Sequence, residues 1–282
     1  MQSPYPSTAL DAARRAIADQ LRDIRRDAGL TGREVAARTG WQPSKVSRLQ
    51  GATTPPADDD IRAWCVACGA EDRIPDLLAA NRTADSMYME WRRLQRTGLR
   101  RLQESRVPLY EQTRQFRVYS STVVPGFLQT REYAVALLES IARFHGTPDD
   151  VADAASARVE RSKIIHQSGR TFAFVVEEAA LRRSVGGPDV MTEQLLHLLD
   201  AARYPAVSLG IVPAGSGAMW PVETFTVYDD EKVSVELLTA SLTITAPTEV
   251  AQYVTAQSEM TGAAVFGQDA YRIIASAIPA PS

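Results

Sequence analysis

Residues 30–50 have the sequence LTGREVAARTGWQPSKVSRLQ, which predicts two short helices joined by a tight turn. Thr31 and Glu34 form a capping-box pattern, in which the hydroxyl bonds the backbone N–H three residues later and the carboxylate bonds back. Gly40 permits the turn that follows the first helix. Pro43 suits the first position of the second helix, because its missing N–H would have no helical partner there.

The second helix of this hairpin has an apolar side and a polar side. Val46 and Leu49 are spaced to meet Val35 and Ala36 of the first helix, where the small alanine allows close approach. The polar side is therefore expected to face outward. The predicted DNA-binding residues are those on this outer side and two at the start of the first helix: Gln42, Ser44, Lys45, Ser47 and Arg48, with Thr31 and Arg33.

The outward side chains match what a major groove offers, since one helix fits the groove and the base edges present donors and acceptors. Arg48 is suited to O6 and N7 of guanine, and Gln42 to adenine. Lys45 and Ser47 are better suited to phosphates, which fix register without reading sequence. The N-terminal part of such a helix normally faces the bases, which favours Gln42 and Ser44 as readers. From spacing alone, a solvated polar face explains the pattern equally well.

Charge is unevenly distributed along the 282 residues, whose formal net charge is −3. Residues 12–50 contain nine Arg and Lys against four Asp and Glu, and residues 81–117 contain nine Arg against four acidic residues. Residues 118–282 contain eleven basic and nineteen acidic residues. A basic front and an acidic rear suit a chain that touches phosphate with one end only.

The first part of the chain predicts a mainly α domain followed by a connector. Helices expected over 10–28, from Asp58 and over 71–84 accompany the hairpin, which gives a helix-turn-helix domain of about five helices over 9–84. The arginine-rich stretch 85–117 is expected to be a helical connector.

The rear part, 118–279, mixes helical patterns with short β-branched segments that turn residues separate. The predicted strands are 172–176, 207–212, 224–228, 233–238 and 242–245, and the predicted helices are 131–142, 147–166, 188–204 and 247–278. We therefore expect an α+β domain for regulation and dimerisation, with a small, mostly antiparallel sheet.

Composition argues against secretion, membrane insertion and catalysis. Two cysteines, Cys65 and Cys68, favour a reducing cytoplasm, and neither a signal peptide nor a run of roughly 18 apolar residues is present. The C-x-x-C pair lacks further ligands for a closed zinc site, so a core role is favoured over a redox switch. The sequence shows no nucleophile–base set and no phosphate-binding loop. We therefore expect that the chain is not an enzyme and that it has no cofactor and no metal site.

Longer segments resemble a known family. Residues 17–52 resemble the Xre/Cro type of helix-turn-helix, and GWQPSKVSRLQ (40–50) looks like the form found in actinobacterial regulators. VVPGFLQTREYAVALL (123–138), VEEAALRRSVGGPDVMTEQLLHLL (176–199) and VSLGIVP (207–213) are similar to the C-terminal domain of the WhiJ-like family of actinobacterial regulators. The resemblance covers nearly the whole chain and implies a DNA-binding regulator. Members of that family resemble antitoxins and are often encoded beside a very short partner protein.

The chain departs from this family at the end of the recognition helix. The family usually has Glu at the position of Gln50 and Gly at the position of Ala52. Here glycine lies one position early, at Gly51. The end of the helix is therefore expected to differ from that of its relatives.

Three hypotheses remain open at this stage. The first is a homodimeric regulator whose two recognition helices enter successive major grooves of a near-palindromic operator. The second is an antitoxin-like interaction protein that binds a small partner protein and regulates its own operon. The third is a regulator whose rear domain binds a small-molecule effector. Trp220 and Met219, in a predicted loop, are candidate contacts for a partner or ligand, although packing onto the domain's own core would explain Trp220 as well.

Overall fold

The computed structural model describes residues 5–147, 149–216, 220, 222–237 and 241–280, with side chains from residue 14 to 82 and from 98 onward. The chain divides into two compact units. The N-terminal unit extends to Glu90 and includes 242–250, and the C-terminal unit comprises 91–241 and 251–282. None of the described helices is both long and apolar enough to cross a membrane.

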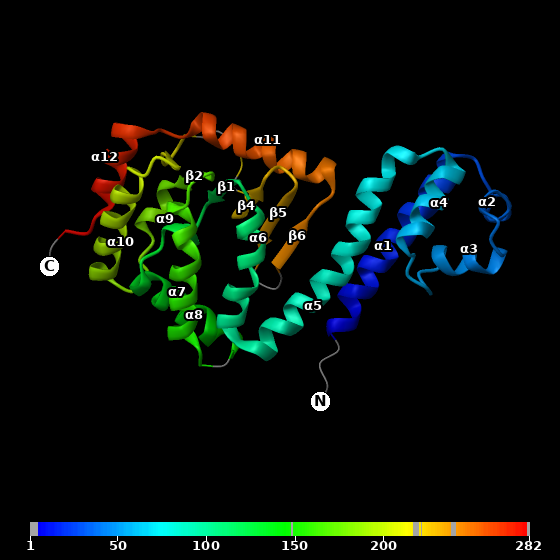
Figure 1. The fold of residues 1–282 in the computed structure, drawn as a ribbon, viewed down its shortest axis with the longest axis horizontal. Helices are drawn as coiled ribbons and strands as arrows, with labels where there is room; N and C mark the ends of the chain where they lie inside the picture. Colours follow the sequence, from blue (N-terminus) through cyan, green and yellow to red (C-terminus); the bar gives the residue numbers. More distant parts are fainter. Residues whose placement is uncertain (1–4, 148, 217–219, 221, 238–240, 281–282) are drawn as a thin grey trace. The chain divides into compact units, whose positions relative to one another are not determined.

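The N-terminal unit is built from helices (Figure 1). They are α1 (Tyr5–Asp27), α2 (Gly32–Thr39), α3 (Pro43–Gln50), α4 (Asp58–Cys68), the 3-10 turn η1 (Glu71–Arg73) and the first part of α5 (Ile74–Ser105). The predicted helical hairpin and the helix predicted from Asp58 are confirmed. The helix predicted over 71–84 begins at Ile74 and continues well beyond its expected end.

Gly98 interrupts α5, because its backbone (φ 80°, ψ 169°) is not helical. The carboxylate of Asp150 accepts hydrogen bonds from the backbone N–H groups of Leu99 (3.1 Å) and Arg100 (2.9 Å). It thereby satisfies donors that have no partner at the start of a helix. Residues 99–105 therefore form a separate helical stretch that is capped by a side chain from far along the chain.

The C-terminal part of the chain contains a six-stranded sheet in the order β3-β2-β1-β4-β5-β6. Its strands are β1 (Gln115–Ser120), β2 (Thr171–Glu177), β3 (Val207–Val212), β4 (Phe225–Tyr228), β5 (Lys232–Glu236) and β6 (Ser241–Ile244). The pairs β1–β2 and β2–β3 are parallel, whereas β1–β4 and β4–β5 are antiparallel. The prediction of a small, mostly antiparallel sheet is therefore wrong, since the sheet is larger and mixed.

The strand that the sequence did not reveal is β1, at the centre of the sheet. It begins within 85–117, so the last residues of the predicted helical connector are strand rather than helix. Because β1 is paired on both edges and carries buried side chains on both faces, such as Val118 and Tyr119, it lacks the alternation that marks a half-exposed strand. Parallel pairing also requires long crossover connections, which are usually helical, and helices do separate β1 from β2 and β2 from β3 along the chain.

Helices accompany this sheet, and α7 packs against α8 while α12 contacts α9, α10 and β3 (Figure 1). The elements are α6 (Val107–Gln112), η2 (Gly126–Leu128), α7 (Arg131–His145), α8 (Val151–Ser162), η3 (Lys163–His166), α9 (Glu178–Arg182), α10 (Pro188–Ala201), α11 (Pro247–Ala263) and α12 (Gly267–Ala277). Aromatic rings form much of the core. Phe116 stacks on Phe172 with centroids 4.6 Å apart, and Tyr110 lies 4.8 Å from Phe127.

A buried amide fixes the loop between β1 and α7. Gln194 of α10 is fully buried. Its Oε1 accepts a hydrogen bond from the backbone N–H of Thr130 (2.8 Å), and its Nε2 donates to the carbonyl of Leu128 (2.7 Å). Both polar ends of the side chain are therefore satisfied by backbone groups, so this loop has a defined position.

Candidate nucleic-acid interface

The α2–α3 hairpin has the local geometry that its sequence predicts. Thr31 is the N-cap of α2, and the reciprocal bonds of the capping box are both present. Gly40 ends α2 in the left-handed conformation (φ 71°), and Pro43 lies in the first turn of α3. The start of each helix is therefore fixed by residues within a few positions of it.

The apolar sides of α2 and α3 form one buried seam. Val35, Ala36, Val46 and Leu49 are each at most 3 % exposed. They join a core that includes Trp64 of α4, whose indole Nε1 donates to the carbonyl of Leu21 in α1 (3.0 Å). The buried seam sets the rotation of α3 and leaves its polar side toward solvent.

The polar side of α3 is largely open. Gln42, Ser44, Ser47 and Arg48 are exposed. Arg48 makes no side-chain ion pair among the described residues. The structure thus brings four of the predicted DNA-binding residues together on one accessible helix face.

Lys45 lies in a different environment from its neighbours on α3. Its Nζ forms an ion pair with Asp60 Oδ1 at 2.5 Å and lies 4.2 Å from the ring centroid of Trp41. Sequence reasoning did not pair Lys45 with either residue, because both partners lie outside α3. A phosphate contact from Lys45 stays a prediction, and Asp60 would compete with the phosphate for the ammonium.

The two predicted residues near the start of α2 are both exposed. The Thr31 hydroxyl donates to Glu34 Oε2 (2.7 Å), so it already has an acceptor within its own helix. Bonds from the Thr31 backbone and hydroxyl lower the pKa of Glu34, which therefore remains ionised at neutral pH. Arg33 extends the exposed basic surface beside this carboxylate.

The end of α3 differs from the family pattern in a defined way. Gly51 has an ordinary backbone (φ −88°), whereas Ala52, the next residue, has φ 54°. The left-handed position is thus occupied by alanine, and glycine lies one residue too early to relieve it. The departure in sequence therefore places strain on the backbone immediately after the recognition helix.

Replacing Ala52 by glycine is expected to raise the free energy of unfolding of the N-terminal unit by about 0.5–1 kcal/mol. A left-handed L-residue costs roughly 1–2 kcal/mol, and the greater chain entropy of glycine offsets part of the gain. Urea denaturation checks the value. Gly51→Ala is the control. Its new Cβ would lie 3.1 Å from the Ser47 carbonyl oxygen, so it should give no gain, and a less stable Ala52→Gly variant would contradict the interpretation.

The C-x-x-C pair lies on α4 as two free thiols. Cys65 is fully buried and Cys68 is half-buried. Burial raises the pKa of Cys65 to about 11 and also raises the pKa of Cys68. Both thiols are therefore held in the unreactive protonated form. No group of three or more potential metal ligands occurs in the described part of the chain.

Iodoacetamide at pH 7.5 is expected to alkylate the folded protein at least roughly tenfold more slowly than the urea-unfolded protein, because the thiolate is the reactive form. Mass spectrometry of Cys65 and Cys68 peptides over time measures both rates. Equal rates in the folded and unfolded chains would instead support a redox switch at this pair.

Of the two candidate partner or ligand contacts that were predicted in the rear domain, Trp220 lies within the described residues. Trp220 is 71 % exposed, so it is not packed into the core of its own domain. It lines an open hollow of ≈ 820 Å³ together with Phe225 of β4 and with Tyr253 and other residues of α11. Met219 lies outside the described residues.

Sequence reasoning missed a cluster of arginines in the C-terminal unit. Arg106, Arg158 and Arg161 line one cavity together. The only local signal was the spacing of Arg158 and Arg161 on one face of a predicted helix. The third member and the cavity itself depend on the arrangement of the sheet, which the sequence did not reveal.

Two family models match the chain. A model described as a helix-turn-helix domain matches residues 16–79, which contain α2 and α3. A model described as a domain of unknown function (DUF5753) matches residues 103–276, more than half of the chain. A search of curated proteins and a search of solved structures each found no match.

Proposed function

The chain belongs to the DUF5753 family, whose defining domain has no known function, and we propose that it is a transcription regulator that binds a specific operator. Its helix-turn-helix domain indicates a DNA-binding regulator. The finer proposal is that α3 enters the major groove. Arg48, Gln42 and Ser44 would then contact bases, while Ser47, Lys45 and Arg33 would contact phosphates.

The observation that carries this proposal is the exposure of the polar side of α3. Val46 and Leu49 are buried while Ser44, Ser47 and Arg48 are exposed on the same short helix. The excess of basic residues within 12–50 favours approach to a polyanion. The acidic rear region then disfavours binding in other orientations.

We further propose that the protein acts as a homodimer on a near-palindromic site, in the manner of Xre/Cro-type regulators. An eight-residue recognition helix such as α3 reaches too few base pairs for useful selectivity, and a two-fold dimer doubles the number of bases read. The C-terminal unit would supply the dimer contacts. This proposal assigns no catalytic role to the chain and places it in the cytoplasm with its DNA.

Replacing Arg48 by alanine is expected to weaken operator binding by about 1–3 kcal/mol, because a bidentate contact to guanine is lost. Fluorescence anisotropy with operator and scrambled duplexes measures specific and non-specific affinity. The operator is first selected from genomic fragments with the wild-type protein. Specific affinity should fall more than non-specific affinity.

The matched control is Arg73→Ala, which removes an exposed arginine from η1 and should leave the sequence preference intact. A salt titration of the wild type tests phosphate contacts, since each one steepens the fall of log K with log salt. A slope near zero would rule out phosphate-led binding. An unchanged sequence preference in Arg48→Ala would remove Arg48 from the base readers.

An antitoxin-like interaction protein is the second candidate. The observation that favours it is the number of large apolar side chains exposed on the C-terminal unit. They include Phe144, Leu196, Trp220, Leu237, Phe266 and Tyr271. Co-expression with the short protein of an adjacent gene tests this function, and a Trp220→Ser variant should release that partner. Isolation of the chain without the co-expressed protein would count against it.

A further inference from the structure

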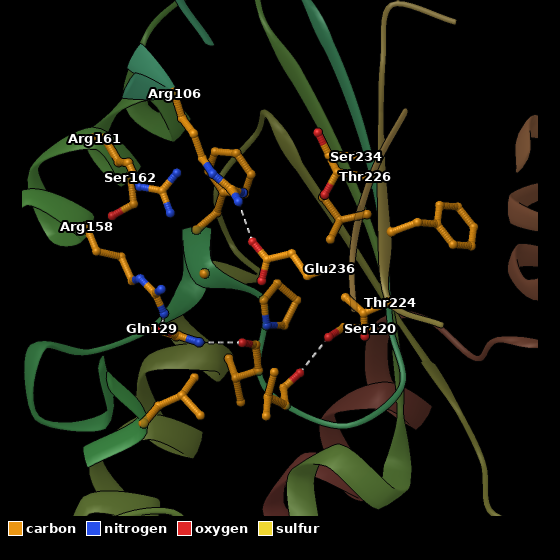
Figure 2. A pocket seen from close by; sticks show the side chains of 18 of the residues that line it. Arg106, Ser120, Gln129, Arg158, Arg161, Ser162, Thr224, Thr226, Ser234 and Glu236 are labelled. Carbon is orange, nitrogen blue, oxygen red and sulfur yellow. Dashed lines mark hydrogen bonds and ion pairs between the residues drawn. The ribbon is translucent and has the colours of Figure 1, made fainter. Parts of the chain in front are cut away.

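The C-terminal unit contains a cavity of ≈ 250 Å³ between α8, the loop that Gln194 fixes and strands β4 and β5 (Figure 2). Ligand sites for drug-sized molecules are roughly 300–1,000 Å³. The cavity is therefore suited to a ligand somewhat smaller than a drug-sized molecule.

One side of the cavity is strongly basic. Arg106, Arg158 and Arg161 lie along it, and Glu236 is the only acidic residue in the lining that the structure describes. Glu236 Oε1 pairs with Arg106 Nη2 at 2.5 Å. Arg158 and Arg161 therefore form no direct ion pair in the described lining, and the charge of Glu236 acts on them without contact.

These two guanidinium groups are held by neutral partners. Arg158 donates to Gln129 Oε1 (2.8 Å) and Gln103 Oε1 (3.2 Å), and Arg161 donates to the Tyr110 hydroxyl (2.7 Å). Arg161 Nε is buried and has no hydrogen-bond partner among the described residues. Both side chains are thus fixed in position while donor capacity remains unused.

The positive charges of Arg158 and Arg161 lower the stability of the fold, because both side chains are partly removed from water. Arg158 and Arg161 are half-buried. Burial and then the neighbouring Arg161 lower the pKa of Arg158 to about 10, so it remains a cation at neutral pH. A cation that is partly withdrawn from water and has no direct ion-pair partner lowers the stability of the fold. A bound anion would offset this loss of stability, because its attraction to the two guanidinium groups would compensate for their desolvation.

The other walls of the cavity complete a small binding site. Hydroxyl groups of Ser120, Thr224, Thr226 and Ser234 lie across from the arginines in Figure 2. Phe127, Leu137 and Ile141 add apolar surface. A ligand held here would carry an acidic group at one end and an apolar body.

We propose that this cavity binds a small organic anion whose carboxylate or phosphate is held by Arg158 and Arg161. Guanidinium groups suit this task because they present paired donors that match both kinds of oxyanion. The apolar part of the ligand packs against Phe127 and Leu137. This binding site goes beyond the proposed DNA-binding role, and testing it requires no DNA.

The test uses the full chain and four probes: phenyl phosphate, benzoate, inorganic phosphate and the neutral benzamide. Calorimetric titration measures affinity, and the rise in melting temperature of the C-terminal unit provides a second readout. We expect phenyl phosphate or benzoate to bind at least tenfold more tightly than benzamide. Whichever acid binds better identifies the acidic group of the natural ligand.

Three variants test the residues. Arg158→Gln should weaken binding of the acid at least tenfold, whereas Arg143→Gln, an exposed change on α7, should leave it unchanged. Glu236→Gln should strengthen binding several-fold, because it removes the negative charge that acts on Arg158 and Arg161 as well as on Arg106. This gain would not follow from a merely structural role, and Glu236 is exposed enough for the variant to fold.

Four results would overturn the proposal. They are equal binding of benzamide and the acids, wild-type affinity in Arg158→Gln, weaker binding in Glu236→Gln, and no binding of either aromatic acid at millimolar concentration. Inorganic phosphate that binds as tightly as phenyl phosphate would contradict the role given to the apolar wall.

Discussion

Replacing Trp64 by alanine is expected to lower the free energy of unfolding of the N-terminal unit by about 3–5 kcal/mol. Trp64 is fully buried at the centre of the unit's core, against α1 and close to Trp41 (ring centroids 6.4 Å apart). The substitution removes the largest side chain of that core and leaves a cavity. Because small domains are stable by only about 5–15 kcal/mol, this loss removes a large share of the unit's stability.

Urea denaturation followed by far-UV circular dichroism measures this loss, and operator binding should weaken with it. The matched control is Trp64→Phe, which keeps most of the apolar volume but loses the bond from Nε1 to the Leu21 carbonyl. Its expected cost is about 1–2 kcal/mol. Unimpaired operator binding by Trp64→Ala would mean that this core does not determine the position of α3.

Replacing Gly98 by alanine is expected to destabilise the C-terminal unit by about 3 kcal/mol. The backbone of Gly98 (φ 80°, ψ 169°) lies in a region that is nearly restricted to glycine and costs roughly 1–3 kcal/mol for other residues. An added Cβ would also overlap the Asp150 carboxylate. Moving that carboxylate would break its bonds to the N–H groups of Leu99 and Arg100, so the two costs add.

Amide hydrogen exchange distinguishes this mechanism from a general loss of stability, since exchange at Leu99 and Arg100 should accelerate most. Gly146→Ala is the matched control. Gly146 also has positive φ (62°), but no atom lies within 4 Å of its added Cβ, so strain alone should cost about 1 kcal/mol. Equal losses in the two variants would show that contact with Asp150 contributes nothing.

Much of the candidate DNA-binding surface could be predicted from sequence because its signals are local. The capping box at Thr31 and the proline at Pro43 act within one helical turn. The spacing of Val46 and Leu49 sets which side of α3 is buried. The partners of Lys45 could not be predicted, since Asp60 and Trp41 reach it from other elements.

The sheet was harder to predict, because pairing joins segments that are distant in sequence. The β-branched residues of the five later segments predicted strands there. β1 is central and buried on both faces, so its sequence pattern resembles the end of a helix as much as a strand. Its parallel pairing with β2 depends on helices that cross between them. The local sequence of a strand does not determine which edge of the sheet it will pair with.

The sequence by itself determined the helical hairpin and its exposed polar side, because helix caps, turns and apolar spacing act over a few residues. Tertiary structure alone decided the order and direction of the strands and the convergence of Arg106 with Arg158 and Arg161. The reason is physical. A long-range contact forms only after distant segments have packed together, so its position depends on the whole core rather than on its own neighbours.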